Sequence, residues 1–154
     1  MRLAKLLRTP GGLPVVDAVK RAGAGLESLR AECLDELRVT LDQAELCANR
    51  ANGEYDAAVA DELYAIASAA IGVPTACGLA PIDTALVSLA DLTDYLRTRE
   101  TWDPNAVAVH LRAFRLLLHT EAGKDSNGTK AILEGLRRVS QRYAKPEIPR
   151  AAAG

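Results

Sequence analysis

Apolar side chains recur along this chain at steps of three and four residues, the spacing that places them on one face of a helix. The first long run predicts a helix over Leu26–Asn49, with a core stripe of Leu26, Leu29, Cys33, Leu37, Leu41, Ala44 and Ala48. Four more helices are predicted over Glu54–Thr75, Pro81–Thr98, Pro104–His119 and Asn127–Tyr143. No stretch alternates at period two for long enough to make a sheet. The pattern therefore predicts an all-α fold, an antiparallel helical bundle with short connections between neighbouring helices.

The two ends of the chain differ from its middle. Met1–Arg8 and Pro14–Arg21 predict short helices, with a break at Thr9–Gly12 and a junction loosened by Gly23 and Gly25. Residues 1–25 are therefore expected to form an N-terminal arm and residues 26–143 the bundle. Residues 144–154, which contain Pro146 and Pro149, are expected to be a disordered tail.

The stretch Leu63–Leu79 carries an unusual outer face. At helical period, its uncharged outer positions are Tyr64, Ser68, Ile71, Gly72 and Thr75. A glycine inside a helix costs about 1 kcal/mol relative to alanine. Two interpretations stay open: Gly72 gives another molecule's backbone room to approach, or the helix simply ends before Pro74.

This stretch resembles the phosphohistidine segment of histidine-phosphotransfer (HPt) domains, which runs roughly His-x-x-Lys-Gly with a second glycine six residues later. Gly72 and Gly78 keep both glycines, and Leu63-Tyr-Ala-Ile-Ala resembles the lead-in. Further on, Val107-Ala-Val-His-Leu-Arg-Ala-Phe resembles a helix of bacterial relatives. The resemblance covers about Leu26 to Tyr143. Ser68 occupies the phosphohistidine position and Ile71 the lysine position, so the family's reactive residues are absent.

The resemblance implies an HPt-like four-helix bundle with additional terminal helices, in a bacterial two-component pathway. Since a serine ester is too stable to relay phosphate, we expect a non-catalytic protein, not an enzyme, that binds a receiver domain of a response regulator, a histidine kinase or both. The expected partner-binding residues are Tyr64, Ser68, Ile71, Gly72 and Thr75. The alternatives are an active phosphotransfer protein that uses a solvent-exposed His110, or a helical adaptor or homodimer whose self-interface is the Ser68 face.

No other catalytic or metal-binding pattern is present. His110 and His119 point to opposite sides of one predicted helix, so they cannot share a metal ion. Ser68 has no base at helical spacing on its own face. HExxH, P-loop and GxSxG motifs are absent. We therefore expect no metal and no cofactor.

The charge composition argues against nucleic acid and an anionic membrane as partners. With 19 basic and 20 acidic side chains the formal net charge is −1, so no strong field would attract nucleic acid or an anionic membrane. Basic residues gather near both ends, most simply as solvated helix ends. No apolar run is expected to approach the ~20 residues that span a bilayer. Cys33, Cys47 and Cys77 are widely spaced within apolar patterns, which predicts free buried thiols and a soluble, cytoplasmic protein.

Overall fold

The computed structural model describes residues 15–122 and 124–144, and every regular element in these ranges is a helix. The helices are α2 (Val15–Asn49), α3 (Ala57–Ala70), α4 (Val73–Ala76), α5 (Ala80–Arg99), α6 (Pro104–Ala122) and α7 (Ser126–Ala144). The predicted all-α bundle is confirmed. The predicted helix Met1–Arg8 and the predicted tail after residue 144 lie outside the described residues.

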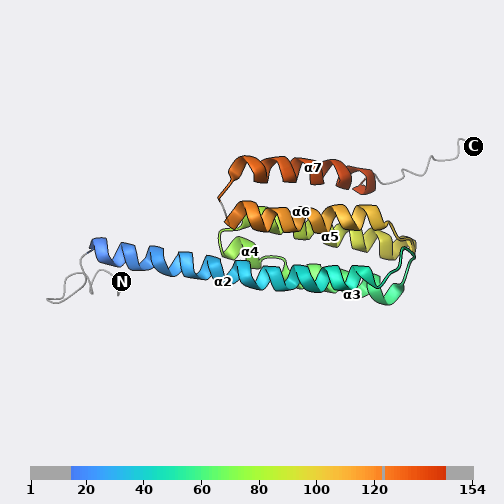
Figure 1. The fold of residues 1–154 in the computed structure, drawn as a ribbon, viewed down its shortest axis with the longest axis horizontal. Coiled ribbons are helices and arrows are strands. Elements are labelled where there is room, and N and C mark those ends of the chain that lie inside the picture. Colours follow the sequence, from blue (N-terminus) through green and yellow to red (C-terminus); the bar gives the residue numbers. More distant parts are fainter. Residues whose placement is uncertain (1–14, 123, 145–154) are drawn as a thin grey trace, which may run out of the picture.

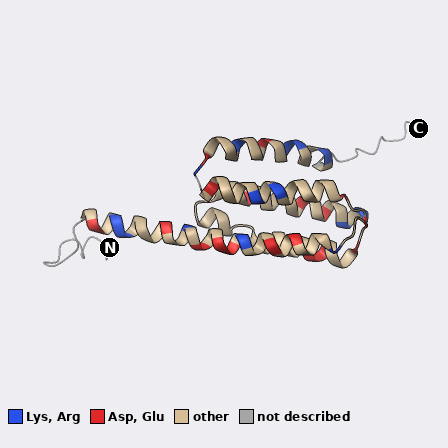
Figure 2. Cartoon of the chain, in the orientation of Figure 1, with Lys and Arg blue, Asp and Glu red and all other residues tan. Residues whose placement is uncertain are grey.

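Four long helices form the bundle. α2 packs against α3 and α6, and α5 packs against the same two helices, so the four close a ring (Figure 1). α7 lies on the outside of this ring, against α5 and α6. The core between the helices is mainly leucine and alanine, with Phe114 as its largest fully buried side chain. Acidic residues are frequent on α2 and α3, whereas most charged residues of α7 are basic (Figure 2).

Short polar connections set the ends of these helices. Asp103 caps α6 as the sequence predicts, since its carboxylate accepts a hydrogen bond of 2.9 Å from the Ala106 amide. Asp56 caps α3 in the same way, through the amides of Ala58 and Val59. Each aspartate satisfies amide donors that have no partner inside their own helix.

The N-terminal half of α2 differs from the prediction. Instead of a short helix and a loose junction, residues 15–49 form one continuous helix through Gly23 and Gly25. The first part of this helix projects beyond the bundle (Figure 1). Leu26 and Leu29 were expected in the core but are 68% and 45% exposed, because α2 extends past the end of the bundle in this part (Figure 1).

The second predicted helix is also shorter than expected. α3 ends at Ala70, and the separate turn α4 follows from Val73. In a continuous helix the ring of Pro74 would collide with the carbonyl of Ala70, four residues earlier. Val73 follows Val59, Leu63, Ile66 and Ala70 at helical spacing and would share their buried side in an unbroken helix, but it is 42% exposed.

Two of the three expected free thiols are paired. Cys33 of α2 and Cys77, just after α4, form a disulfide with their Cα atoms 6.6 Å apart. Cys47 stays a buried free thiol, and its burial raises the pKa. Periodicity within each helix could not show that α4 brings Cys77 back to α2. The cytoplasmic location stays a prediction. It has lost the support of three free thiols, because disulfides persist mainly in oxidising compartments.

The expectation that no apolar run approaches the length of a membrane span is also wrong. Within the described residues, Ala57–Ala76 is long and apolar enough by length and composition to cross a membrane. In the fold this stretch is not one helix, because Gly72 adopts a φ of 94° between α3 and α4.

Candidate functional site

The five residues expected to bind a partner lie at the end of α3 and in the turn that follows it. Tyr64 and Ser68 are half-buried on α3, whereas Ile71 is 40% exposed and Gly72 and Thr75 are exposed. Only the first two share a helical face, because α3 ends before Ile71. The structure keeps the five residues close along the chain but replaces the expected continuous face with a helix end and a turn.

Asp83, in the first turn of α5, fixes this turn from the other side. Its carboxylate accepts hydrogen bonds from the Gly72 amide at 2.7 Å and the Thr75 amide at 2.8 Å. The Thr75 hydroxyl also donates to this carboxylate. Thr75 therefore uses its amide and its hydroxyl to hold the turn. Ile71 directly precedes Gly72, so the bond to the Gly72 amide also restricts the backbone that carries Ile71. The role of Asp83 was not predicted, since nothing in its local spacing signals contacts with residues 8 and 11 positions earlier.

Gly72 is needed for its backbone conformation. Its φ of 94° is rarely adopted by residues that have a side chain, and Gly78 closes α4 with a φ of 75°. A Cβ added to Gly72 would meet no atom within 4 Å. Of the two interpretations left open by the sequence, the helix end is confirmed.

Tyr64 contributes less open surface than expected. The guanidinium of Arg97 lies 4.2 Å from the centre of its ring, in a cation–π contact. Arg97 is held there by Asp94 at 3.0 Å and by Asp61 at 3.5 Å. The remaining accessible surface is small and uncharged, and it centres on Ile71 and Val73, which are 40% and 42% exposed. We call these two side chains, with Ser68 and Gly72, the turn patch.

His110 is buried in the structure, at 1% exposure. Its Nδ1 lies 2.8 Å from the Ala106 carbonyl, which can only accept, so Nδ1 carries the proton and Nε2 is an acceptor. The Ser88 hydroxyl, 3.0 Å from Nε2, must then donate to it, and Ser140 donates to Ser88 at 2.5 Å. Burial lowers the pKa of His110, although the bond to Ala106 opposes this. The exposure that phosphotransfer through His110 requires is not met.

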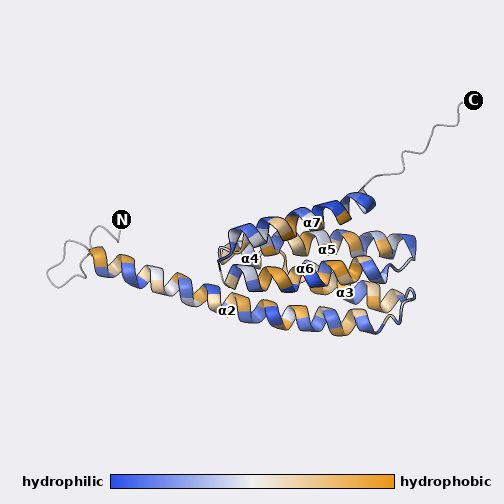
Figure 3. Cartoon of the chain, turned by 45° about the horizontal axis from the view of Figure 1, so that its top comes forward, coloured by the Kyte–Doolittle hydropathy of each residue, from blue (hydrophilic) through white to orange (hydrophobic). Residues whose placement is uncertain are grey.

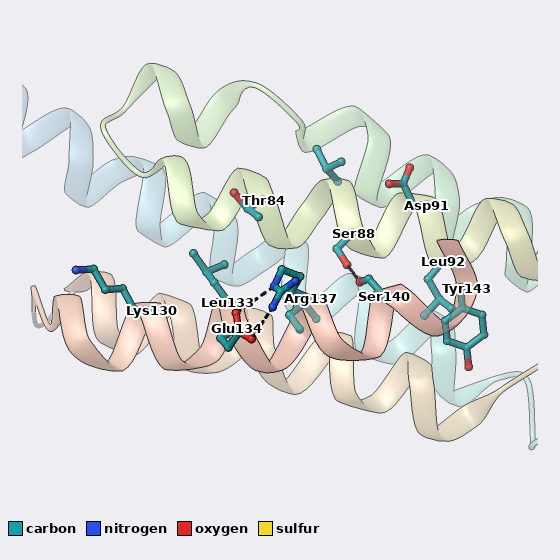
Figure 4. A pocket seen from close by; sticks show the side chains of 12 residues that line it. Thr84, Ser88, Asp91, Leu92, Lys130, Leu133, Glu134, Arg137, Ser140 and Tyr143 are labelled. Atoms are coloured by element: carbon teal, nitrogen blue, oxygen red, sulfur yellow. Dashed lines mark hydrogen bonds and ion pairs between the residues drawn. The ribbon is translucent and has the colours of Figure 1, made fainter. Parts of the chain in front are cut away.

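These three side chains join α5, α6 and α7 below a groove of about 650 Å³ between α5 and α7. Figure 4 shows Ser88 and Ser140 meeting across it, with Leu92, Leu133 and Tyr143 along its walls. At its end, Tyr143 donates a hydrogen bond to Asp103, and burial, then this bond, raise the pKa of Tyr143 to about 12.

A serine paired with a histidine is the start of a nucleophilic site. No sequence motif signals this pair, because Ser88 is 22 residues from His110 and 52 residues from Ser140. The pair lacks the rest of such a site. Ser88 and Ser140 lie inside α5 and α7, where backbone amides are used in the helix and cannot form an oxyanion hole. The side chains of Ser88, His110 and Ser140 therefore form a hydrogen-bonded link between α5, α6 and α7.

The described residues contain no group of three or more His, Cys, Asp or Glu side chains that could hold a metal ion. The chain matches no protein-family model, no curated protein and no solved structure at a significant level. Its function must be argued from its own surface and chemistry.

Proposed function

We propose that this chain is a non-catalytic HPt-like signalling protein that binds a response-regulator receiver domain, or the histidine kinase that phosphorylates it, and modulates the phosphorelay without carrying phosphate. The observation that carries the proposal is the turn patch, an exposed apolar surface on a turn that Asp83 holds in place. An exposed apolar surface with a fixed backbone is typical of protein docking, because little ordering is lost when a partner binds.

The charge distribution supports the same function. Residues 63–82 contain no Lys, Arg, Asp or Glu, and the nearby Asp83 carboxylate is bonded to the Gly72 and Thr75 amides. An ordinary solvated helix end would carry charged side chains. Ser68, beside Ile71, provides no imidazole at the position where HPt domains carry their phosphate, and His110 is enclosed by the bundle.

The test is a binding titration of the protein against the receiver domains and histidine kinases of its source organism. Ile71→Lys should weaken binding to the true partner at least about tenfold, because a charge replaces the apolar centre of the interface. Leu116→Lys is the matched control. Leu116 is a similarly exposed aliphatic residue, at 47%, but it lies on α6, so its replacement should leave binding unchanged.

A second measurement addresses phosphate transfer. The protein is incubated with a radiolabelled, phosphorylated receiver domain and with an autophosphorylated kinase. We expect no acid-labile label on this chain. Label that appears here, or a partner affinity that Ile71→Lys leaves unchanged, contradicts the proposal.

A further inference from the structure

The groove between α5 and α7 has the dimensions of a small-molecule site. Its volume is about 650 Å³, and ligand pockets in proteins range from about 300 to 1,000 Å³. Hydrophobic and hydrophilic residues are mixed along α7 (Figure 3). Val87 of α5, which is 42% exposed, and the half-buried Leu133 of α7 line the groove from its two sides. The groove can therefore cover the apolar part of a ligand.

The serines at the floor of this groove belong to a chain of hydrogen bonds with a fixed direction. His110 is neutral because burial disfavours its charge, so Nδ1 donates to the Ala106 carbonyl and Nε2 accepts from Ser88. Ser88 has one hydroxyl proton and uses it in this bond, so Ser140 must be the donor in the bond between the two serines.

Ser140, at the end of this chain, has thereby used its own proton. Its oxygen keeps lone pairs that can accept a further hydrogen bond, but the hydroxyl has no proton left to donate. A ligand group that meets Ser140 must therefore be a donor. A carboxylate or a phosphate is excluded at this place, because such a group can only accept.

The charges along the groove favour a cationic donor at the serines. Asp91 follows Ser88 by three residues on α5, so the two side chains are neighbours on the helix surface. Asp91 lines the groove and is exposed, and it forms no ion pair with any other described residue. Lys130, the lysine that lines the groove, lies ten residues before Ser140, about 15 Å away along α7.

The arginine that lines the groove is already neutralised. Arg137 donates from Nε and Nη2 to the two carboxylate oxygens of Glu134, at 3.0 and 2.8 Å (Figure 4). Arg138 also pairs with Glu134, but it is 75% exposed and does not line the groove. The serine end of the groove therefore combines an acceptor hydroxyl with the Asp91 carboxylate. An ammonium group satisfies both, since it is positively charged and carries only donors.

We propose that the groove between α5 and α7 binds a small amphipathic primary amine. Its ammonium group donates to Ser140 beside Asp91, and its apolar body lies along the groove between Val87 and Leu133. The site shares no residue with the turn patch and does not depend on the proposed receiver binding.

The test compares three ligands that have the same length of chain and different head groups. n-Octylamine is a cationic donor, 1-octanol a neutral donor and octanoate an anionic acceptor. Each is titrated into the ¹⁵N-labelled full chain, and the amide chemical shifts are followed by NMR. We expect n-octylamine to shift amides of residues 84–92 and 130–143. It should bind several-fold more tightly than 1-octanol and at least about tenfold more tightly than octanoate, as a charge-assisted bond predicts.

Two variants separate the charge from the hydrogen bond. Asp91→Asn should weaken n-octylamine several-fold and leave 1-octanol unchanged, because only the amine is charged. Ser140→Ala should weaken both ligands, because both donate. Asp94→Asn is the matched control for Asp91→Asn. Asp94 is an exposed aspartate on the same helix that pairs with Arg97 outside the groove, so its replacement should leave n-octylamine binding unchanged.

Four results would overturn the proposal. They are a chain that binds none of the three ligands, shifts that fall outside α5 and α7, octanoate or 1-octanol binding as tightly as n-octylamine, and an Asp91→Asn variant with unchanged affinity for n-octylamine. Asp91→Asn changes an exposed side chain, so this variant tests the site without disturbing the core.

Discussion

Two glycines of this chain have opposite effects at the scale of a single residue. Gly72 adopts a φ of 94°, whereas Gly135 lies inside α7 with no positive φ, and a Cβ at either position would meet no atom within 4 Å. We therefore expect Gly72→Ala to lower the free energy of unfolding by about 1–2 kcal/mol, the cost of a left-handed backbone for a residue with a side chain. Gly135→Ala should raise it by about 0.5–1 kcal/mol, as expected for a helix interior.

Urea unfolding monitored by circular dichroism measures both changes. Because neither substitution causes a clash, the opposite signs report backbone conformation alone. If Gly72→Ala were as stable as the native chain, the turn after α3 would not have the conformation described here.

His110 gives a prediction about pH. Its pKa is lowered by burial in the folded state, so below its ordinary value the unfolded chain binds a proton more readily than the folded one. Stability should be complete near neutral pH and should fall as the pH drops through the ordinary histidine range, by about 1.4 kcal/mol for each unit by which folding lowers the pKa. Chemical denaturation at a series of pH values measures this loss.

Replacement of each histidine tests the assignment. His110→Gln should flatten the pH dependence, because no imidazole is then buried among Ser88, Ala106 and Ser140. His119→Gln changes an exposed residue and should keep the native profile. An unchanged slope in His110→Gln would contradict the burial of a neutral imidazole.

The sequence predicted contacts at this scale when they are local. Asp103 could be identified as an N-cap because the residues that it caps follow it directly. Asp83 could not, since its partners Gly72 and Thr75 belong to a turn that only tertiary packing brings to α5. The hydrogen bonds among Ser88, His110 and Ser140 span three helices and were missed for the same reason.

Helix boundaries depend on what surrounds a glycine. The sequence alone predicted a loose junction at Gly23 and Gly25 and a helix that extends to Thr75. In the structure α2 runs through both glycines, and α3 ends at Ala70. A single helical glycine costs only about 1 kcal/mol, so α2 passes through two of them. At Gly72 the decisive residue is Pro74, whose ring excludes a helix that would continue from Ala70.

The disulfide between Cys33 and Cys77 ties α2 to the end of α4 across a sequence separation of 44 residues. In the chain-entropy model, a loop of this size stabilises the fold by about 4 kcal/mol. We expect a reducing agent to lower the free energy of unfolding by an amount of that order, measured by urea denaturation with and without reductant. The double variant Cys33→Ala/Cys77→Ala should be less stable and should not respond to reductant.

Counting thiols tests the pairing directly. Alkylation of the denatured, unreduced chain should label Cys47 alone, and alkylation after reduction should label all three cysteines. Three labelled thiols without reduction would contradict the disulfide and restore the original prediction of free thiols.

At the scale of the whole molecule, stability should differ along one continuous helix. Residues 34–47 of α2 include Leu34, Leu37, Leu41 and Ala44, which are buried in the bundle core, whereas residues 15–29 are exposed except for the half-buried Ala18. Amide hydrogen exchange resolves such differences, because each amide exchanges when its part of the structure opens.

Residues 18–28 should therefore exchange faster than the part of α2 that lies in the bundle. In dilute solution we expect amides of residues 18–28 to exchange rapidly, since a single helix of this length opens readily. Amides of residues 34–47 should be protected, so they serve as the internal reference. Protection of residues 18–28 equal to that of residues 34–47 would contradict the exposure of the first part of α2.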